Sequence, residues 1–287
     1  MAREGRHRII ASGRGVLRVK TVAVAPLKKY GQNFLTSPAV ARRIVDAAVL
    51  APQDTVLEIG PGKGILTRLM AQKCCRVWAV EIDPRLAESL KASFRDDGKV
   101  RIITEDILKY DLAEISAAGK DSFKVVANLP YNISVPILEK LYRLGGKVSS
   151  MVVMVQKEMA DRIVAKPGNK EYGSLSVFTQ CLVKVERLFN VSAGSFFPRP
   201  KVNSSVVRMV PLKILPVKQG EQEGFFEFVR LCFSQRRKML RSVLRGRYVW
   251  PEGSDGSCPE TDLARRAEEL SVGQFYELYQ TVKAVGQ

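Results

Sequence analysis

An apolar strand in the first quarter of the chain runs into a glycine-rich turn and then a predicted helix, and this order limits the possible folds. The strand Thr55–Ile59 reads TVLEI, the turn at 60–64 reads GPGKG, and we expect a helix over Ile65–Gln72. Strand, glycine turn and helix in this order open a Rossmann-like α/β sheet. The spacing is G-x-G-x-G after Glu58, which matches neither the dinucleotide pattern nor the phosphate-cradling P-loop. We therefore expect a nucleoside ligand without phosphates near these glycines.

A carboxylate follows the second predicted strand, Arg76–Val80. Glu81 lies 21 positions after Gly60, and a carboxylate at about this distance holds a ribose diol in Rossmann-like sheets. Asp83 is the competing residue, because spacing alone does not separate the two. We prefer Glu81 for the ribose and expect Asp83 to cap the helix that begins at Pro84.

Two acids also follow the third predicted strand, Val100–Thr104. Asp106 could accept a hydrogen bond from an adenine amino group at the carboxyl edge of the sheet, but Glu105 stands beside it and spacing does not distinguish them. We expect the sheet to end with the strands Met151–Val155, Val183–Val191 and Val202–Val210, the last two as an antiparallel pair.

The fourth predicted strand, Phe123–Ala127, stops abruptly at the sequence NLPY. Pro130 cannot donate to a ladder and disfavours helical geometry at Leu129. The chain therefore leaves the sheet as a constrained loop at a strand's carboxyl end, where open α/β sheets bind ligands. This loop offers the Asn128 amide, the Leu129 carbonyl and the Tyr131 ring, which suit an amino group and a stacked purine. The alternative is an ordinary strand and turn.

Composition limits the class of protein. The 287 residues are 46% hydrophobic, with a formal net charge of +17, which favours a globular protein that binds a polyanion such as nucleic acid. The five cysteines include no C-x-x-C, so we expect reduced thiols, no metal site and a cytoplasmic protein. No apolar run is long enough for a membrane span. Residues 1–27 are rich in arginine and are expected to form a flexible basic arm.

The chain changes character after a linker at Pro211–Gly224. The following residues have a helical period, and a helix through the next cations would place Arg237, Arg241 and Arg245 on one face. We interpret this face as a phosphate-contacting surface; a solvated helix face is the alternative. The predicted units are the arm at 1–27, an α/β domain at 28–211, and a small all-helical domain at 212–287 that ends in helices Asp262–Leu270 and Val272–Val285.

The order of several motifs resembles one family. From Lys28 onward, the chain contains motifs similar to those of the ribosomal RNA adenine N6,N6-dimethyltransferases, in the same order. These motifs are KKYGQNFL, EIGPGKG, NLPYNIS, QKE, YGSLSV and FFPRPKVNSSVV. QKE and YGSLSV look like the group that acts on the small subunit. One departure is Asn203, where many members have Asp, and it affects no residue assigned to the chemistry.

The resemblance implies that residues 28–211 form a class I S-adenosylmethionine-binding methyltransferase domain and that residues 212–287 form an RNA-binding domain. The implied methyl donor is S-adenosylmethionine, and the implied substrate is two adjacent adenosines of a 3′-terminal hairpin loop of small-subunit (16S) rRNA. The resemblance also implies a monomer acting on an immature 30S subunit. Asn128 and the Leu129–Pro130 turn would hold the amino group, Tyr131 and Phe196 would stack on the base, and Lys201 in the loop 195–202 would contact RNA. A plain hairpin connection with a buried Phe is the alternative for that loop. The implied donor contacts are Asn33, Leu35, Gly60, Gly62, Glu81, Asp106 and Asn128.

Three other functions are compatible with parts of the sequence. The first is a large-subunit (23S) rRNA or DNA adenine methyltransferase, although DNA enzymes usually have Pro where Leu129 stands. The second is a nucleic-acid-binding assembly or transcription factor that kept the fold and lost the reaction. The third is a nicotinamide dehydrogenase, which the glycine spacing and the basic charge disfavour.

Overall fold

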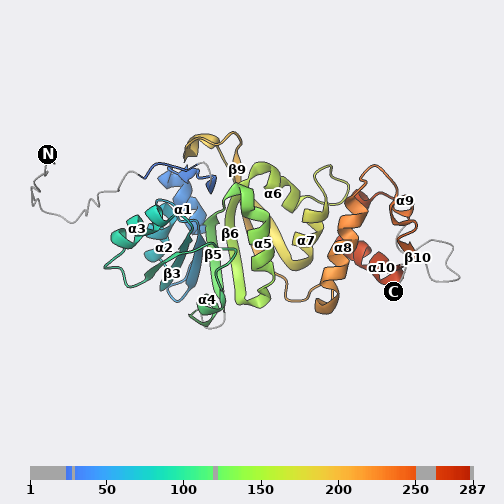
Figure 1. Ribbon diagram of the computed structural model, residues 1–287, viewed down its shortest axis with the longest axis horizontal. Helices are drawn as coiled ribbons and strands as arrows, with labels where there is room; N and C mark the ends of the chain where they lie inside the picture. Colours follow the sequence, from blue (N-terminus) through green and yellow to red (C-terminus); the bar gives the residue numbers. More distant parts are fainter. Residues whose placement is uncertain (1–23, 28–29, 119–121, 250–262, 285–287) are drawn as a thin grey trace, which may run out of the picture.

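The computed structural model describes residues 24–27, 30–118, 122–249 and 263–284. Its centre is a seven-stranded sheet (Figure 1). The strands of the sheet are β2 (Thr55–Ile59), β3 (Arg76–Glu81), β4 (Val100–Thr104), β5 (Phe123–Asn128), β6 (Val148–Gln156), β7 (Val183–Val191) and β9 (Ser204–Pro211). These strands confirm the predicted α/β class, and β2, β4 and β7 have the predicted bounds.

The strand order is β4-β3-β2-β5-β6-β9-β7. The first five strands are parallel, and β9 runs antiparallel to both β6 and β7, which confirms the predicted antiparallel pair. The order reverses between β2 and β5, because the chain moves outward to β4 and then returns to the other side of β2. Ligands bind at such switch points, beyond the carboxyl ends of the strands.

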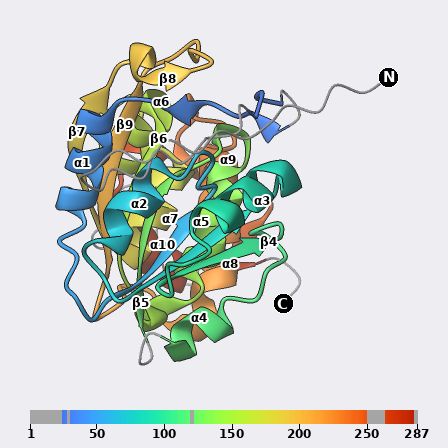
Figure 2. The same cartoon turned by 90° about the vertical axis from the view of Figure 1, so that its left-hand side faces the viewer.

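Helices cover both faces of this sheet (Figure 2). They are α1 (Pro38–Ala47), α2 (Ile65–Ala71), α3 (Pro84–Ser93), α4 (Ala113–Ala118), α5 (Ser134–Tyr142), α6 (Lys157–Val164) and α7 (Ser174–Leu182). One apolar cluster joins α1 and α2 to one face, and a second joins α4, α5 and α6 to the other. Ser37 caps α1 through the Val40 N–H, and Asp83 caps α3 through the Arg85 N–H, as their positions before prolines predict.

A third apolar cluster holds the C-terminal part together. Phe225, Phe228 and Phe275 are fully buried in it, and Tyr172 and Val177 from the segment around α7 pack in the same cluster. Helix α7 therefore connects the two parts of the molecule, as Figure 1 shows. The helices of the C-terminal part are α8 (Gln222–Phe233), α9 (Leu240–Leu244) and α10 (Val272–Thr281), and a short ladder joins β10 (Tyr248–Val249) to β11 (Lys283–Ala284).

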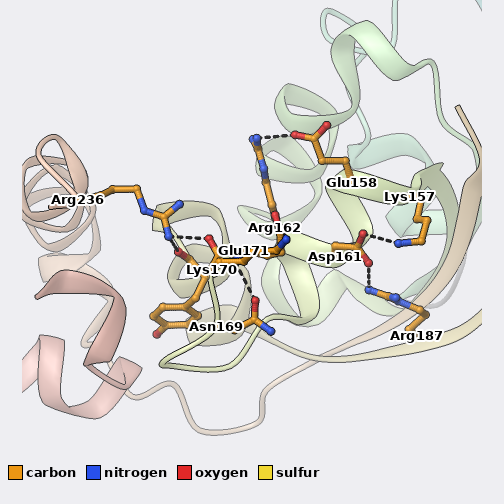
Figure 3. Close-up of polar contacts among 10 residues, drawn as sticks. Lys157, Glu158, Asp161, Arg162, Asn169, Lys170, Glu171, Arg187 and Arg236 are labelled. Carbon is orange, nitrogen blue, oxygen red and sulfur yellow. Dashed lines mark hydrogen bonds and ion pairs between the residues drawn. The ribbon is translucent and has the colours of Figure 1, made fainter. Parts of the chain in front are cut away.

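The loop between α6 and α7 is tied to the C-terminal part by one arginine (Figure 3). Arg236 donates to the carbonyls of Lys170 and Tyr172 at 2.7 and 2.9 Å and pairs with Glu268 at 2.9 Å. The Gly168 N–H donates to the Glu268 carbonyl at 2.7 Å. Arg236 is thus used for contacts within the protein.

Three sequence predictions fail in the C-terminal part. The helix predicted over Val272–Val285 ends at Thr281, and Lys283–Ala284 pair with β10 as strand β11. The predicted helix at Asp262–Leu270 is absent from its described residues, which form an isolated bridge between Met239 and Arg266 and a 3₁₀ turn at Ala267–Glu269. The same bridge interrupts the expected arginine helix, because Met239 is extended and α9 begins only at the next residue. Residues 1–23 of the predicted basic arm lie outside the described residues.

Candidate active site

A cavity opens beyond the carboxyl ends of β2, β3 and β5. Four stretches of the described chain contribute to its lining: 30–35, 58–66, 81–86 and 128–131. The first stretch includes strand β1 (Phe34–Leu35), which is held in place by its antiparallel pairing with β8 (Phe196–Phe197). The cavity therefore lies at the switch point that the strand order defines, and residues from distant parts of the sequence meet there.

The glycine turn brings backbone close to this cavity. Gly60 and Gly62 have φ values of 63° and 59°, a region that residues with a side chain rarely adopt. A Cβ atom on Gly62 would lie 3.0 Å from Phe34 Cδ1. The Gly62 N–H points at Glu81 and donates to its Oε2 at 3.0 Å. The turn thus leaves room beside Phe34 and also fixes the carboxylate on the neighbouring strand.

Glu81 and Asp83, which sequence spacing could not separate, differ clearly in the structure. Glu81 is 4% exposed, lines the cavity, and accepts hydrogen bonds from the N–H groups of Gly62 and Asp83 at 3.0 Å each. Burial raises the pKa of Glu81. Asp83 does not line the cavity; Arg85 pairs with it at 2.7 Å and Gln32 donates to it at 2.9 Å. These contacts, with Arg85 foremost, lower the pKa of Asp83 to about 2.

Asp106 stands outside the cavity lining. It follows β4, and its Oδ1 accepts from the Leu108 N–H at 2.9 Å. Glu105, the competing acid, is exposed, and its Oε1 accepts from the Asp106 N–H at 3.0 Å. The Glu105 N–H donates to the Glu81 carbonyl at 3.1 Å, which places this turn directly beside the end of β3.

The loop after β5 presents two hydrogen-bond acceptors. Asn128 donates its Nδ2–H to the Asn33 carbonyl at 3.2 Å, while its Oδ1 is buried and has no partner among the described residues. The Leu129 N–H donates to the Met154 carbonyl at 3.0 Å, and no donor from the described chain reaches the Leu129 carbonyl. A buried amide oxygen without a partner is costly, so an external donor group is the natural complement to this site.

Tyr131 and Phe196 differ in exposure. Tyr131 lines the cavity, is half-buried, and shares a 2.6 Å hydrogen bond with the Ser204 hydroxyl. Phe196 is 4% exposed and packs in the core cluster beneath β1, whereas Phe197 is 58% exposed. The ladder with Leu35 turns the Phe196 ring inward. Base stacking by Phe196 stays a prediction. Its ring is buried in this structure, as the alternative of a plain hairpin connection with a buried Phe also expects.

Sequence reasoning missed Glu58 as part of the site. This residue lies on β2, is 1% exposed and lines the cavity. Thr67 donates its hydroxyl hydrogen to Glu58 Oε2 at 2.5 Å. Burial raises the pKa of Glu58 to about 8, and the nearby Glu81 charge adds to the effect. The signal was available, because an acid inside an otherwise apolar central strand needs a reason to be there.

The predicted RNA-binding cations are exposed but do not form one helical face. Arg237 lies in the turns after α8, Arg241 lies within α9, and Arg245 follows its last residue. Arg241 and Arg245 border a shallow surface hollow together with Tyr248. Lys201 is exposed in the loop before β9. Within the described residues, no helix is suited to crossing a membrane and no group of side chains has the arrangement of a metal site.

Comparison with solved structures identifies the class. The fold matches a dimethyladenosine transferase from Plasmodium falciparum with a TM-score of 0.71 at 24% identity, covering 85% of this chain and 95% of that one. It also matches the 23S rRNA methyltransferase ErmE with a TM-score of 0.66 at 25% identity, covering 86% and 98%. The sheet, the glycine turn and the cavity are those of a class I S-adenosylmethionine-dependent methyltransferase.

Sequence comparison identifies the family. The profile described as ribosomal RNA adenine dimethylase matches residues 26–283, and the chain belongs to this family. A protein from Geobacter metallireducens named ribosomal RNA small subunit methyltransferase A is 42% identical to this chain over 265 residues, which cover 90% of this chain and 96% of the relative. A protein of the same name in Levilactobacillus brevis is 43% identical over 260 residues, covering 88% of each. The resemblance inferred from the motifs is thereby confirmed.

Proposed function

We propose that this enzyme transfers methyl groups from S-adenosylmethionine to the N6 atoms of two adjacent adenosines in a 3′-terminal hairpin loop of small-subunit rRNA. Membership of the rRNA adenine dimethylase family and the relatives named small subunit methyltransferase A support this reaction. The observation that carries the mechanism is the buried, unpartnered Oδ1 of Asn128 beside the Leu129 carbonyl.

The cavity fits the methyl donor. Glu81 would hold the ribose hydroxyls, because its oxygens are already oriented by two backbone N–H groups and keep lone pairs for further donors. The absence of a side chain at Gly62 leaves the approach beside Phe34 open. The remaining donor contacts that we propose come from Asn33, Leu35, Gly60, Asp106 and Asn128. Of these, Asp106 alone stands outside the cavity lining, and we assign it to the adenine.

The loop after β5 would prepare the nucleophile. Bound S-adenosylmethionine supplies an electrophilic methyl group on a sulfonium centre. The lone pair of an adenine amino group is delocalised into the ring, which makes it a poor nucleophile. If Asn128 Oδ1 and the Leu129 carbonyl accept its two hydrogens, the nitrogen is held with its lone pair directed at the methyl group. Positioning and fixed dipoles of this kind lower a barrier by several kcal/mol.

Three features keep these acceptors in place. Asn128 is anchored through Asn33, and the Leu129 N–H is anchored to β6. Ser134 donates its hydroxyl hydrogen to the Pro130 carbonyl at 2.8 Å, which closes the loop onto α5. The loop can therefore present its acceptors with little rearrangement, as preorganised electrostatic catalysis requires.

The target adenosine must leave its stack to reach this loop, at a cost that is smallest in single-stranded RNA. We propose that Tyr131 stacks on the extruded base, which contributes about 1–3 kcal/mol. Phe196 is the second stacking residue of our sequence prediction, and replacing Phe196 or Phe197 separately by Leu tests it. A larger loss of RNA-dependent activity in the Phe197 variant would remove Phe196 from the assignment.

We propose that exposed lysine and arginine side chains bind the ribosome. Four exposed cations are suited to phosphate contacts: Arg237, Arg241, Arg245 and Lys201. We propose that the substrate is an immature 30S subunit, and that the enzyme acts in the cytoplasm as a monomer. The net charge of +17 is consistent with a polyanionic partner of this size.

Methyl transfer to isolated ribosomal subunits tests the function. Tritium from labelled S-adenosylmethionine is expected to enter small subunits purified from cells that lack the endogenous dimethylation, and not large subunits from the same cells. Labelling of large subunits would favour a 23S rRNA methyltransferase. Donor binding without any transfer to either subunit would favour a binding factor that has lost the reaction.

A further inference from the structure

A lysine on α5 holds the turn that follows β4. The Lys140 ammonium group donates to the backbone carbonyls of Ile107, Leu108 and Tyr110 at 2.8, 3.0 and 2.6 Å. An ammonium group has three N–H donors, so all of them are directed at one turn of another element. Lys140 is half-buried. These contacts identify it as a support for the turn rather than a solvated surface charge.

The supported turn carries Asp106. The Leu108 N–H donates to Asp106 Oδ1 at 2.9 Å, so the residue whose carbonyl Lys140 binds also fixes the Asp106 side chain. The turn begins one residue after the ladder between Thr104 and Glu81 ends. The position of Asp106 relative to the donor cavity therefore depends on how this turn is held from outside.

Helix α5 is firmly packed, so it can support the turn that follows β4. Ile137, Leu138 and Leu141 are buried in the apolar cluster beneath the sheet. At the start of the helix, the Ser134 hydroxyl donates to the Pro130 carbonyl of the loop after β5. One rigid helix is thus bonded at one end to the loop with the two acceptors and, through Lys140, to the turn with Asp106.

We propose that Lys140 is a positioning residue that places Asp106 against the adenine of the methyl donor. The inference rests on the role proposed above for Asp106. Without the ammonium group, three carbonyls of the turn lose their hydrogen-bond partner, and the turn keeps only non-directional apolar packing against α5, through the cluster that Ile107 shares with Ile137 and Leu138. The contacts to the adenine of the methyl donor should weaken, whereas those to its ribose should not, since Glu81 and the glycine turn are held independently of Lys140.

The test compares two donor-site ligands that differ at one group. S-adenosylhomocysteine carries the exocyclic amino group, and S-inosylhomocysteine carries an oxygen in its place. Lys140→Met is expected to weaken S-adenosylhomocysteine binding about tenfold, in the range typical for a lost supporting contact. Its affinity for S-inosylhomocysteine should change little. The KM for S-adenosylmethionine should rise while kcat at saturating donor is retained.

Lys91→Met is the matched control, because Lys91 is an exposed lysine paired with Glu88 and lies away from the cavity. It should leave both affinities unchanged. Hydrogen exchange at the Leu108 amide gives an independent structural readout and should accelerate in Lys140→Met alone. Unchanged affinities in Lys140→Met, or equal losses for the two ligands, would overturn the inference.

Asp106→Asn separates the inference from the function on which it rests. If Asp106 accepts from the adenine amino group, this variant should lose the preference for S-adenosylhomocysteine over S-inosylhomocysteine. A preserved preference would refute the role of Asp106, and the inference would fall with it. A lost preference in Asp106→Asn, together with a fully retained one in Lys140→Met, would refute only the positioning role of Lys140.

Discussion

Replacing Glu58 by Gln should make the protein more stable at neutral and alkaline pH. Glu58 is buried on β2, where removal from water disfavours its charged form and raises its pKa from 4.5 to about 8. The hydrogen bond from Thr67 and the charge of Arg68 act in the opposite direction but do not offset burial. Gln keeps the size and the acceptor oxygen without the ionisation.

The sign and size follow from proton linkage. Between pH 4.5 and about 8 the folded state binds more protons at Glu58 than the unfolded state, so stability falls as pH rises. The full effect of such a shift is about 5 kcal/mol, and about 3 kcal/mol of it lies between pH 5 and pH 7.5. Gln does not ionise, so the free energy of unfolding of the variant does not fall in this way. The difference in free energy of unfolding between the variant and the wild type should therefore grow by about 3 kcal/mol from pH 5 to pH 7.5.

Urea unfolding followed by circular dichroism at several pH values measures the difference. The free energy of unfolding of Glu58→Gln minus that of the wild type should increase steadily from pH 5 to pH 8. Glu88→Gln is the control, because Glu88 is 72% exposed and its substitution should show no such trend. A difference independent of pH would mean that Glu58 is ionised in the folded protein, and the account of its burial would be wrong.

The remaining predictions concern the donor and the RNA. Glu81→Ala should raise the KM for S-adenosylmethionine about tenfold or more, as expected for lost hydrogen bonds to a charged group, with a smaller change in kcat. Asp83→Ala should instead lower stability by about 1 kcal/mol or more through loss of the α3 cap, and an equal rise in KM would assign the ribose contact to Asp83. Replacing Arg237, Arg241 and Arg245 together by Ala should reduce the slope of log K against log salt by about 2 in RNA-binding titrations, and an unchanged slope would make these residues a solvated surface.

Local chemistry explains what could be predicted from the sequence. β2 was predicted because a short apolar run ends at glycines, and α3 because Asp83 precedes Pro84. Asn128 was placed at the edge of the sheet because Pro130 ends the ladder. In each case the deciding residues are neighbours in the chain, so the structure could be inferred without knowing how distant segments meet.

Contacts between distant segments explain the rest. The pairing of Met239 with Arg266 interrupts the arginine helix, although the local sequence has a helical period. The ladder of β1 with β8 buries Phe196. Lys140 reaches a turn 30 to 33 positions earlier in the chain. None of these partners is indicated by spacing, because each depends on which elements the fold brings side by side.

In the proposed mechanism, the Asn128 amide oxygen and the Leu129 carbonyl hold the adenine amino group for methyl transfer. The single-turnover rate of methyl transfer by Asn128→Ala, with saturating S-adenosylmethionine and small subunits, tests this role. We expect the rate to fall about 10²- to 10³-fold, as for loss of one positioned group at a reacting centre, with the affinity for the small subunit unchanged. A rate close to that of the wild type would mean that Asn128 does not position the amino group.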